Sequence, residues 1–150
     1  MTTITEARDD IMAAFRAEWN ARAAAANGGT LPKVIWQRVE PSGAQKPKGT
    51  EAWARVTVEH NEGGQATFGG PGNRLFDREG IVTVQVFTPQ KSDQGGTVLE
   101  ALGAIARDAF EGRSTPSGVW FRDVRLQEVG PDEPWWQLNV TAKFNYDELK

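Results

Sequence analysis

The chain contains no cysteine and a single histidine, and it has no long apolar run. Without cysteine it has neither a disulfide framework nor a thiolate nucleophile, which is compatible with a reducing compartment. One histidine and no cysteine exclude the common zinc ligand sets. No segment approaches the roughly 18 apolar residues of a membrane-spanning helix, and the first residues lack the pattern of a signal peptide. We therefore expect no metal, no cofactor and no membrane partner.

What is present is the composition of an ordinary globular protein. A length of 150 residues favours one domain, and 39% hydrophobic with 25% charged residues is a typical balance. Six tryptophans and seven phenylalanines supply enough apolar area to offset chain entropy. The net charge of −3 argues against a general nucleic-acid binder, which normally shows a basic face. It leaves open a protein that merely surrounds DNA.

Two amphipathic helices are predicted. The first covers about residues 5–26, because Thr3 and Glu6 have the spacing of a capping box and apolar side chains recur at helical spacing after them. The Asn-Gly-Gly sequence at 27–29 provides a left-handed stop. The second helix covers about residues 97–110, with a clear apolar stripe.

Strands are predicted at residues 33–39, 51–60, 81–88, 119–129 and 135–146. Along 51–60, small apolar residues on one face alternate with Trp53 and polar residues on the other, as in a half-buried strand. The segment 119–129 forms one or two strands, broken near Arg122 and Asp123. The last two strands form an antiparallel hairpin, because only a turn at 130–134 joins them. The second helix links its flanking strands as a crossover or as a packed return.

This order of elements predicts an α+β fold in one domain over residues 1–150. We expect a single mixed or mainly antiparallel sheet of roughly four to six strands, with two helices packed on one face. Residues 61–79 form a glycine-rich arm or loop, because a structureless loop of that length is uncommon in a compact domain. Two short ribbon arms at 65–68 and 73–77, bent at 69–72, would account for it. A phosphate loop is excluded, since no Gly-Lys-Ser/Thr follows.

No catalytic group stands out, and we predict that the protein is not an enzyme. His60 is expected at a solvated strand end, and the serines lie in Gly/Pro-rich loops without a nucleophile elbow. The acidic pairs are expected to be surface charge. Trp53 and Trp135 would project from the sheet as interface anchors or base-stacking platforms, unless both faces of the sheet are covered and every tryptophan is core. Trp135 and Trp136 would lie on opposite faces.

Three segments carry a resemblance to a known family. They are residues 80–89 (GIVTVQVFTP), the Gly-Thr start and Phe-Glu-Gly end of residues 96–112, and residues 136–147 (WQLNVTAKFNYD), after an alanine-rich first helix. Over about residues 4–147 the chain resembles the tail terminator proteins of long-tailed bacteriophages, including the phage-tail-terminator-like family.

The resemblance implies a structural virion protein that is assembled in the host cytoplasm and sits at the head-proximal end of the tail. It implies a ring, commonly a hexamer, that caps the tail tube, ends tube polymerisation and provides the surface for head–tail joining. The implied partners are other copies of the chain, the tail tube protein and the head–tail connector protein, with DNA passing through the lumen without specific binding. Another neck, head-completion or tail-tube protein is the alternative, and a small ligand-binding or enzymatic domain is less favoured.

The interface positions are our own inference, because the family carries no motif residues with assigned chemistry. The glycine-rich arm could reach a neighbouring copy or a tube subunit and become ordered on contact. The predicted interface residues are Phe68, Arg74, Leu75, Phe76, Arg78, Trp53 and Trp135.

Overall fold

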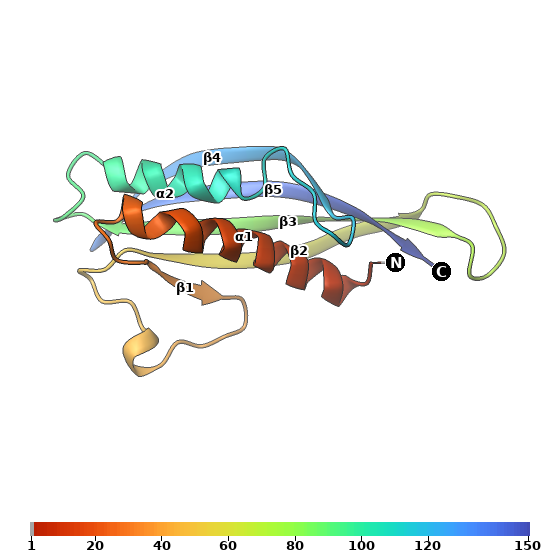
Figure 1. Cartoon of the computed structure of the whole chain (residues 1–150), viewed down its shortest axis with the longest axis horizontal. Coiled ribbons are helices and arrows are strands. Elements are labelled where there is room, and N and C mark those ends of the chain that lie inside the picture. Colours follow the sequence, from red (N-terminus) through yellow and green to blue (C-terminus); the bar gives the residue numbers. More distant parts are fainter. Residues whose placement is uncertain (1) are drawn as a thin grey trace.

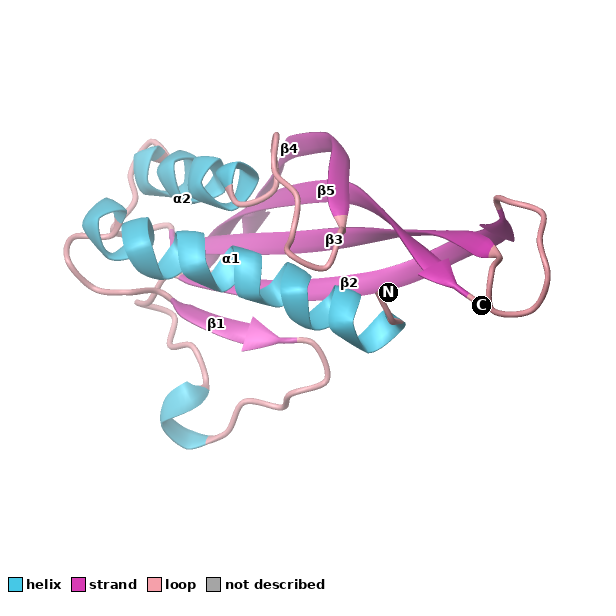
Figure 2. Cartoon of the chain, turned by 45° about the vertical axis from the view of Figure 1, so that its right-hand side comes forward, coloured by secondary structure: helices cyan, strands magenta, loops and turns pink. Residues whose placement is uncertain are grey.

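A computed structural model describes residues 2–150, apart from the side chains of Ala44 and Glu62. Two helices lie on one face of a five-stranded sheet (Figures 1 and 2). The predicted α+β class, with a single mixed sheet, is confirmed. The elements are α1 (Ile4–Ala26), β1 (Lys33–Trp36), η1 (Gly43–Gln45), β2 (Trp53–Gln65), β3 (Leu75–Pro89), α2 (Thr97–Asp108), β4 (Trp120–Asp132) and β5 (Trp135–Leu149).

The strand order in the sheet is β1-β2-β3-β5-β4. β1 is parallel to β2, and the other neighbouring pairs are antiparallel. Both β3 and β4 run antiparallel to β5, so they run in the same direction with β5 between them. The segment containing α2 is therefore a crossover connection, which decides between the two alternatives left open by the sequence.

The first helix begins as predicted. The amide of Glu6 donates to Oγ1 of Thr3 over 3.2 Å, and the amide of Thr3 donates to Oε2 of Glu6 over 2.8 Å. Gly28, with φ of 67°, supplies the left-handed stop. The helix presents one stripe of fully buried side chains to the core: Ala7, Ile11, Phe15, Trp19 and Ala23.

The core fills the layer between the helices and the sheet. Alternate residues of the three central strands point into it, among them Val56, Val84 and Val140, which are completely buried. Phe15 contributes an aromatic group, with its ring centroid 5.1 Å from that of Trp19. Burial of apolar area of this kind is the main favourable term in folding.

The second helix is capped by a residue that sequence reasoning missed. Asp93 is 3% exposed, and its carboxylate accepts hydrogen bonds from the amides of Val98 and Leu99 over 3.0 and 2.9 Å. The hydroxyl of Thr88 donates to the same carboxylate over 2.8 Å. These bonds satisfy early amides of α2 that have no partner within the helix. Asp93 lies before the helix, outside the usual cap position.

The structure corrects several strand boundaries. β1 ends at Trp36, short of the predicted 39, because Arg38 adopts a left-handed conformation with φ of 61° and ends the strand. β4 continues to Asp132, which pairs with Trp135 at the start of β5. Residues 130–132 of the predicted turn at 130–134 are therefore paired strand. The predicted break near Arg122 is confirmed as a register shift in the pairing of β4 with β5.

Candidate functional site

Three strands continue past the helices as an arm (Figures 1 and 2). We define the arm as residues 62–79 together with residues 145–149. Cross-strand pairing of Gly64 with Asp77, and of Asp77 with Asp147, shows that the ladder is three strands wide. The paired strands lie closer to the body than the predicted ribbon arms at 65–68 and 73–77, because β2 ends at Gln65 and β3 begins at Leu75. Residues 66–74 are loop.

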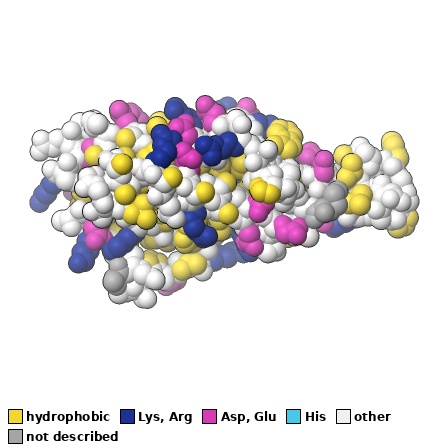
Figure 3. All heavy atoms as spheres, viewed as in Figure 1, with side chains coloured by type: hydrophobic (Ala, Val, Ile, Leu, Met, Phe, Trp, Pro, Cys, Tyr) yellow, Lys and Arg dark blue, Asp and Glu magenta, His cyan; other side chains and the backbone are white. Residues whose placement is uncertain are grey.

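The loop at the tip of the arm is anchored at its base. Arg74 and Lys150 exchange backbone hydrogen bonds of 2.9 and 2.8 Å, and Nε of Arg74 donates to the carbonyl of Gly69 over 2.7 Å. Phe68 projects from this loop with its side chain fully exposed. Figure 3 shows hydrophobic side chains gathered at this outer end of the arm. The loop therefore holds an exposed aromatic ring on a fixed base.

Arg78 lies across the arm on the same sheet face as Phe76. Its Nε donates to Oε2 of Glu148 over 3.2 Å, and its guanidinium lies 5.3 Å from the ring centroid of Phe76. A Cβ at Gly63 would overlap this guanidinium, so glycine leaves the space that Arg78 occupies. Leu75 pairs with Leu149 on the opposite face. The structure thus brings together the five predicted interface residues that belong to the arm.

Trp53 and Trp135 lie at the other end of the sheet, on the face without helices. The ring of Trp53 stacks on Phe87 with centroids 4.1 Å apart, and Trp135 meets Trp53 edge-on at 5.5 Å. Nε1 of Trp135 donates to the carbonyl of Glu51 over 3.1 Å. Trp53 is only 6% exposed, so it offers little surface in the single chain. An interface role for these two rings stays a prediction, separate from the arm. Trp136 packs against the core on the helix side.

His60 differs from the solvated strand end that the sequence predicted. It is half-buried, and its ring lies edge-on to Phe144 and Tyr146 at centroid distances of 5.3 and 5.8 Å. Burial lowers the pKa of His60 below its ordinary value of 6.5, and the positive charge of Arg8 lowers the pKa further. The aromatic partners come from the end of β5, which sequence spacing could not place beside His60.

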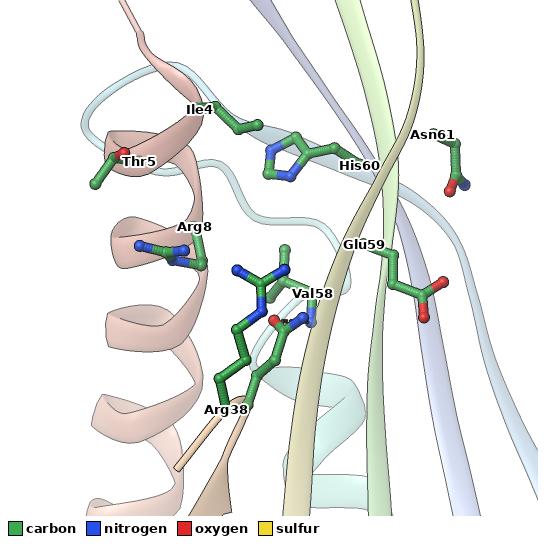
Figure 4. A pocket seen from close by; sticks show the side chains of 9 residues that line it. Ile4, Thr5, Arg8, Arg38, Val58, Glu59, His60 and Asn61 are labelled. Carbon is green, nitrogen blue, oxygen red and sulfur yellow. Dashed lines mark hydrogen bonds between the residues drawn. The ribbon is translucent and has the colours of Figure 1, made fainter.

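A pocket of about 400 Å³ adjoins His60, between α1 and the end of β1 (Figure 4). Arg8 of α1 and Arg38, just after β1, both line it. Figure 4 shows the guanidinium of Arg38 between α1 and β2, while Glu59 points to the other side of β2. The pocket is therefore positively charged within a chain whose net charge is −3. No sequence motif indicated it.

The exposed large hydrophobic residues fall into three groups. The arm carries Phe68 and Leu149. Leu31 precedes the first edge strand and Val39 follows it, and Ile4 at the start of α1 lines the same pocket as Arg38. We call these three residues the β1 flank. On the opposite edge strand lie Trp120, Leu126 and Val129, which we call the β4 flank. Scattered exposed apolar residues need no explanation, but these mark both edges of the sheet and the tip of the arm.

The uncovered sheet face carries uncharged polar side chains at its centre, with exposed Arg55 on β2 and Arg125 on β4 in the same two rows. Thr57, Thr83 and Thr141 form one cross-strand row, and Gln85 pairs with Asn139 in the next. All five side chains are half-exposed. This face therefore offers uncharged hydrogen-bonding groups in its centre and one arginine on each side of them.

Among the side chains that the structure describes, no cluster of three His, Asp or Glu residues could hold a metal ion. Neither helix in the described part of the chain is both long and apolar enough to cross a membrane.

Comparison with known proteins establishes the fold and no more. No family model matches the chain, and no curated protein matches it. One solved protein that carries no descriptive name has a TM-score of 0.63 at 16% identity, covering 95% of this chain and 96% of its own. A chain from the virion of a native gene transfer agent particle has a TM-score of 0.45 at 17% identity, covering 94% and 97%. The first likeness shows a shared fold; the second is too weak to support a conclusion.

Proposed function

We propose that this chain is a structural virion protein of the tail-terminator type. It forms a ring on the end of a phage tail tube, ends tube polymerisation, and provides a surface for head–tail joining. The sequence resemblance supports this proposal, and the arm is the structural observation that carries it. A three-stranded arm with an exposed phenylalanine at its tip is suited to reaching another protein.

The arm is prepared for contact before any partner arrives. Its ladder and the bonds of Arg74 fix the base of the loop, so little ordering remains for contact to complete. Pre-ordered elements bind with a smaller entropy cost, and exposed aromatic side chains are common anchors at interfaces. We assign Phe68 as the anchor for the tail tube. Ordering on contact is then confined to residues 66–74, a shorter segment than the sequence predicted.

A closed ring needs two different surfaces on each copy, related by a rotation that closes. The β1 flank and the β4 flank meet this need, because they lie at opposite edges of one sheet. If the β1 flank of each copy contacts the β4 flank of the next, the sheets line the ring side by side. One face of every sheet then points towards the ring axis. The uncovered face suits that position, because its central Thr, Gln and Asn side chains neutralise no phosphates and only Arg55 and Arg125 extend their two rows. So few cations would hold DNA weakly and let it slide.

The proposal is tested with the tail tube protein encoded in the same genome, polymerised in vitro with and without this chain. We expect substoichiometric amounts of the chain to shorten the tubes and to appear at their ends in electron micrographs. Phe68→Ala should lose this effect, whereas Lys91→Ala, an exposed change outside the arm, should keep it. Unchanged tube length with the native chain would refute the terminator role. Long polymers of the chain alone would instead assign it as a tube subunit.

A further inference from the structure

Two residues other than glycine have a left-handed backbone within the described part of the chain. They are Arg38, with φ of 61°, and Asp123, with φ of 50°. Such conformations are unfavourable for residues with a side chain, and they persist where the surroundings impose them, often at functional positions. Both residues are exposed, and they carry opposite charges. Arg38 is the more unusual of the two, because Asp, like Asn, adopts this conformation more readily and Asp123 lies in a bulge.

The two residues lie at the same level of the sheet, on opposite edges. Oε1 of Gln37, the neighbour of Arg38, accepts a hydrogen bond from the amide of Val58. Val58 pairs with Val82, and Val82 pairs with Ala142. Asp123 lies in the bulge of β4 opposite Ala142, since the flanking pairs join Arg122 to Lys143 and Arg125 to Thr141. One cross-strand row thus begins beside Arg38 and ends at Asp123.

We propose that Arg38 of one copy forms an ion pair with Asp123 of the next copy. This inference rests on the proposed ring and names the contact that sets its register. Because the two residues share one row, successive copies would meet without a shift along the strands. The occupant of the positive pocket beside Arg38 is then the β4 flank of a second copy of this chain.

The two ends differ in their surroundings, because Asp123 already has two cationic neighbours in its own chain and Arg38 has no anionic one in the part of the chain that the structure describes. Among the described residues, no carboxylate lies within ion-pair distance of Arg38. Asp123 is 46% exposed, and its carboxylate lies 3.4 Å from Nζ of Lys143 and 3.6 Å from Nη1 of Arg122. Both contacts are made to Oδ2, so Oδ1 of this half-exposed carboxylate stays open to a guanidinium from outside.

In this proposal the apolar flanks supply the affinity between two copies, and the ion pair determines their register. Val39 follows Arg38, and Leu126 lies close after Asp123, so each charge has an exposed apolar neighbour. Charge pairs at interfaces chiefly determine register and partner choice, while buried apolar anchors supply most of the affinity. The same flanks that close the ring would therefore carry the charges that align it.

The absence of cysteine allows a direct test of proximity. In the double variant R38C/D123C, a short bis-maleimide should link neighbouring copies into a series of covalent oligomers. On a denaturing gel, the largest of these should contain as many subunits as the ring. Mixing R38C with D123C should give only a dimer, and each single variant alone should give none. R38C/K91C is the matched control, because Lys91 is equally exposed but lies outside both flanks. If the control gives as much of the covalent oligomer series as R38C/D123C does, the pairing is refuted.

Charge reversal gives an independent test, because misfolded variants could lose self-association but could not regain it when they are mixed. R38E and D123R should each weaken self-association by at least about tenfold, because like charges then meet. An equal mixture of the two variants should restore assembly in an alternating ring. At one kind of interface the introduced carboxylate meets the introduced guanidinium, and at the other the two native side chains meet. D123N keeps the left-handed preference and removes only the charge, so it should weaken association less.

The outcomes separate this inference from the proposed function. Rings that form without a 38–123 crosslink, and that tolerate R38E, would overturn the pairing and leave the ring intact. A chain that never self-associates in free solution would also overturn the pairing. In that case the tube-length assay decides the terminator role separately.

Discussion

In the body of this protein β2, β3 and β5 are covered by two helices, whereas in the arm the same three strands continue uncovered. The body buries Val82, Val84 and Val86 completely on its helix side. The corresponding side of β3 in the arm carries Phe76 and Arg78, both half-exposed. One strand thus changes from a core element to a surface element along its length.

This difference indicates that the body provides the stability of the fold and that the arm provides exposed surface for contacts. The body has the apolar burial that stabilises a fold, and the arm has mainly a backbone ladder with the Arg78–Glu148 ion pair, which contributes little at such exposure. The arm is therefore expected to tolerate side-chain changes that the body does not. Variants placed in each region should separate folding from assembly.

The largest expected effect is the loss of a core ring. Phe15→Ala should lower the free energy of unfolding by about 3–5 kcal/mol, because a fully buried ring leaves a cavity that the core cannot refill. Chemical denaturation followed by tryptophan fluorescence measures it. Phe76→Ala in the arm is the matched control and should cost much less. An equal loss in both variants would show that the arm belongs to the core.

An intermediate effect is expected at the cap of α2. Asp93→Ala should lower the free energy of unfolding by about 1–3 kcal/mol, because it leaves two amides of α2 and the Thr88 hydroxyl without their acceptor. Thermal denaturation followed by circular dichroism measures this. Asp147→Ala, at an exposed position on the arm, should be close to neutral. A neutral Asp93→Ala would contradict the assigned capping role.

The junction of body and arm should respond to pH through His60. Its pKa is lowered in the folded chain, so the unfolded chain takes up the proton first as the pH falls. Stability should therefore decline as the pH drops below about 6.5, the ordinary value for histidine, and level off below the folded pKa. Denaturation of the native chain and of His60→Gln across this range isolates the contribution. Parallel curves for the two proteins would contradict it.

The smallest expected effect on stability comes from the tip of the arm. Phe68→Ala should change the free energy of unfolding by less than about 0.5 kcal/mol, because the ring is fully exposed and packs against nothing in the chain. Assembly on tube ends should nevertheless be lost. A stability loss as large as that of Asp93→Ala would mean that the ring packs against the chain in solution, and would argue against a free anchor.

Local signals in the sequence predicted the local features. Thr3 with Glu6 predicted the start of α1, Gly28 its end, and the break at Arg122 the bulge in β4. Those features depend on neighbours within a few residues. The α+β class followed from the order of such segments.

Features that depend on distant partners could not be predicted. The glycines at 63 and 64 interrupt any strand pattern, yet they lie in a ladder because β3 continues alongside them. Trp53 alternates like an exposed residue but is covered by Phe87 and Trp135. Arg38 and Asp123 are 85 positions apart by their numbers in the sequence, and only the strand order places them at the ends of one row.

The central claim is that this chain assembles into a closed ring. Light scattering after size exclusion, across a wide concentration range and followed by negative-stain imaging, tests it most directly. The account predicts one discrete species of about six subunits with a central hole, closed by a repeated heterologous interface. A monomer at every concentration, or open-ended polymers without a limiting mass, would contradict it.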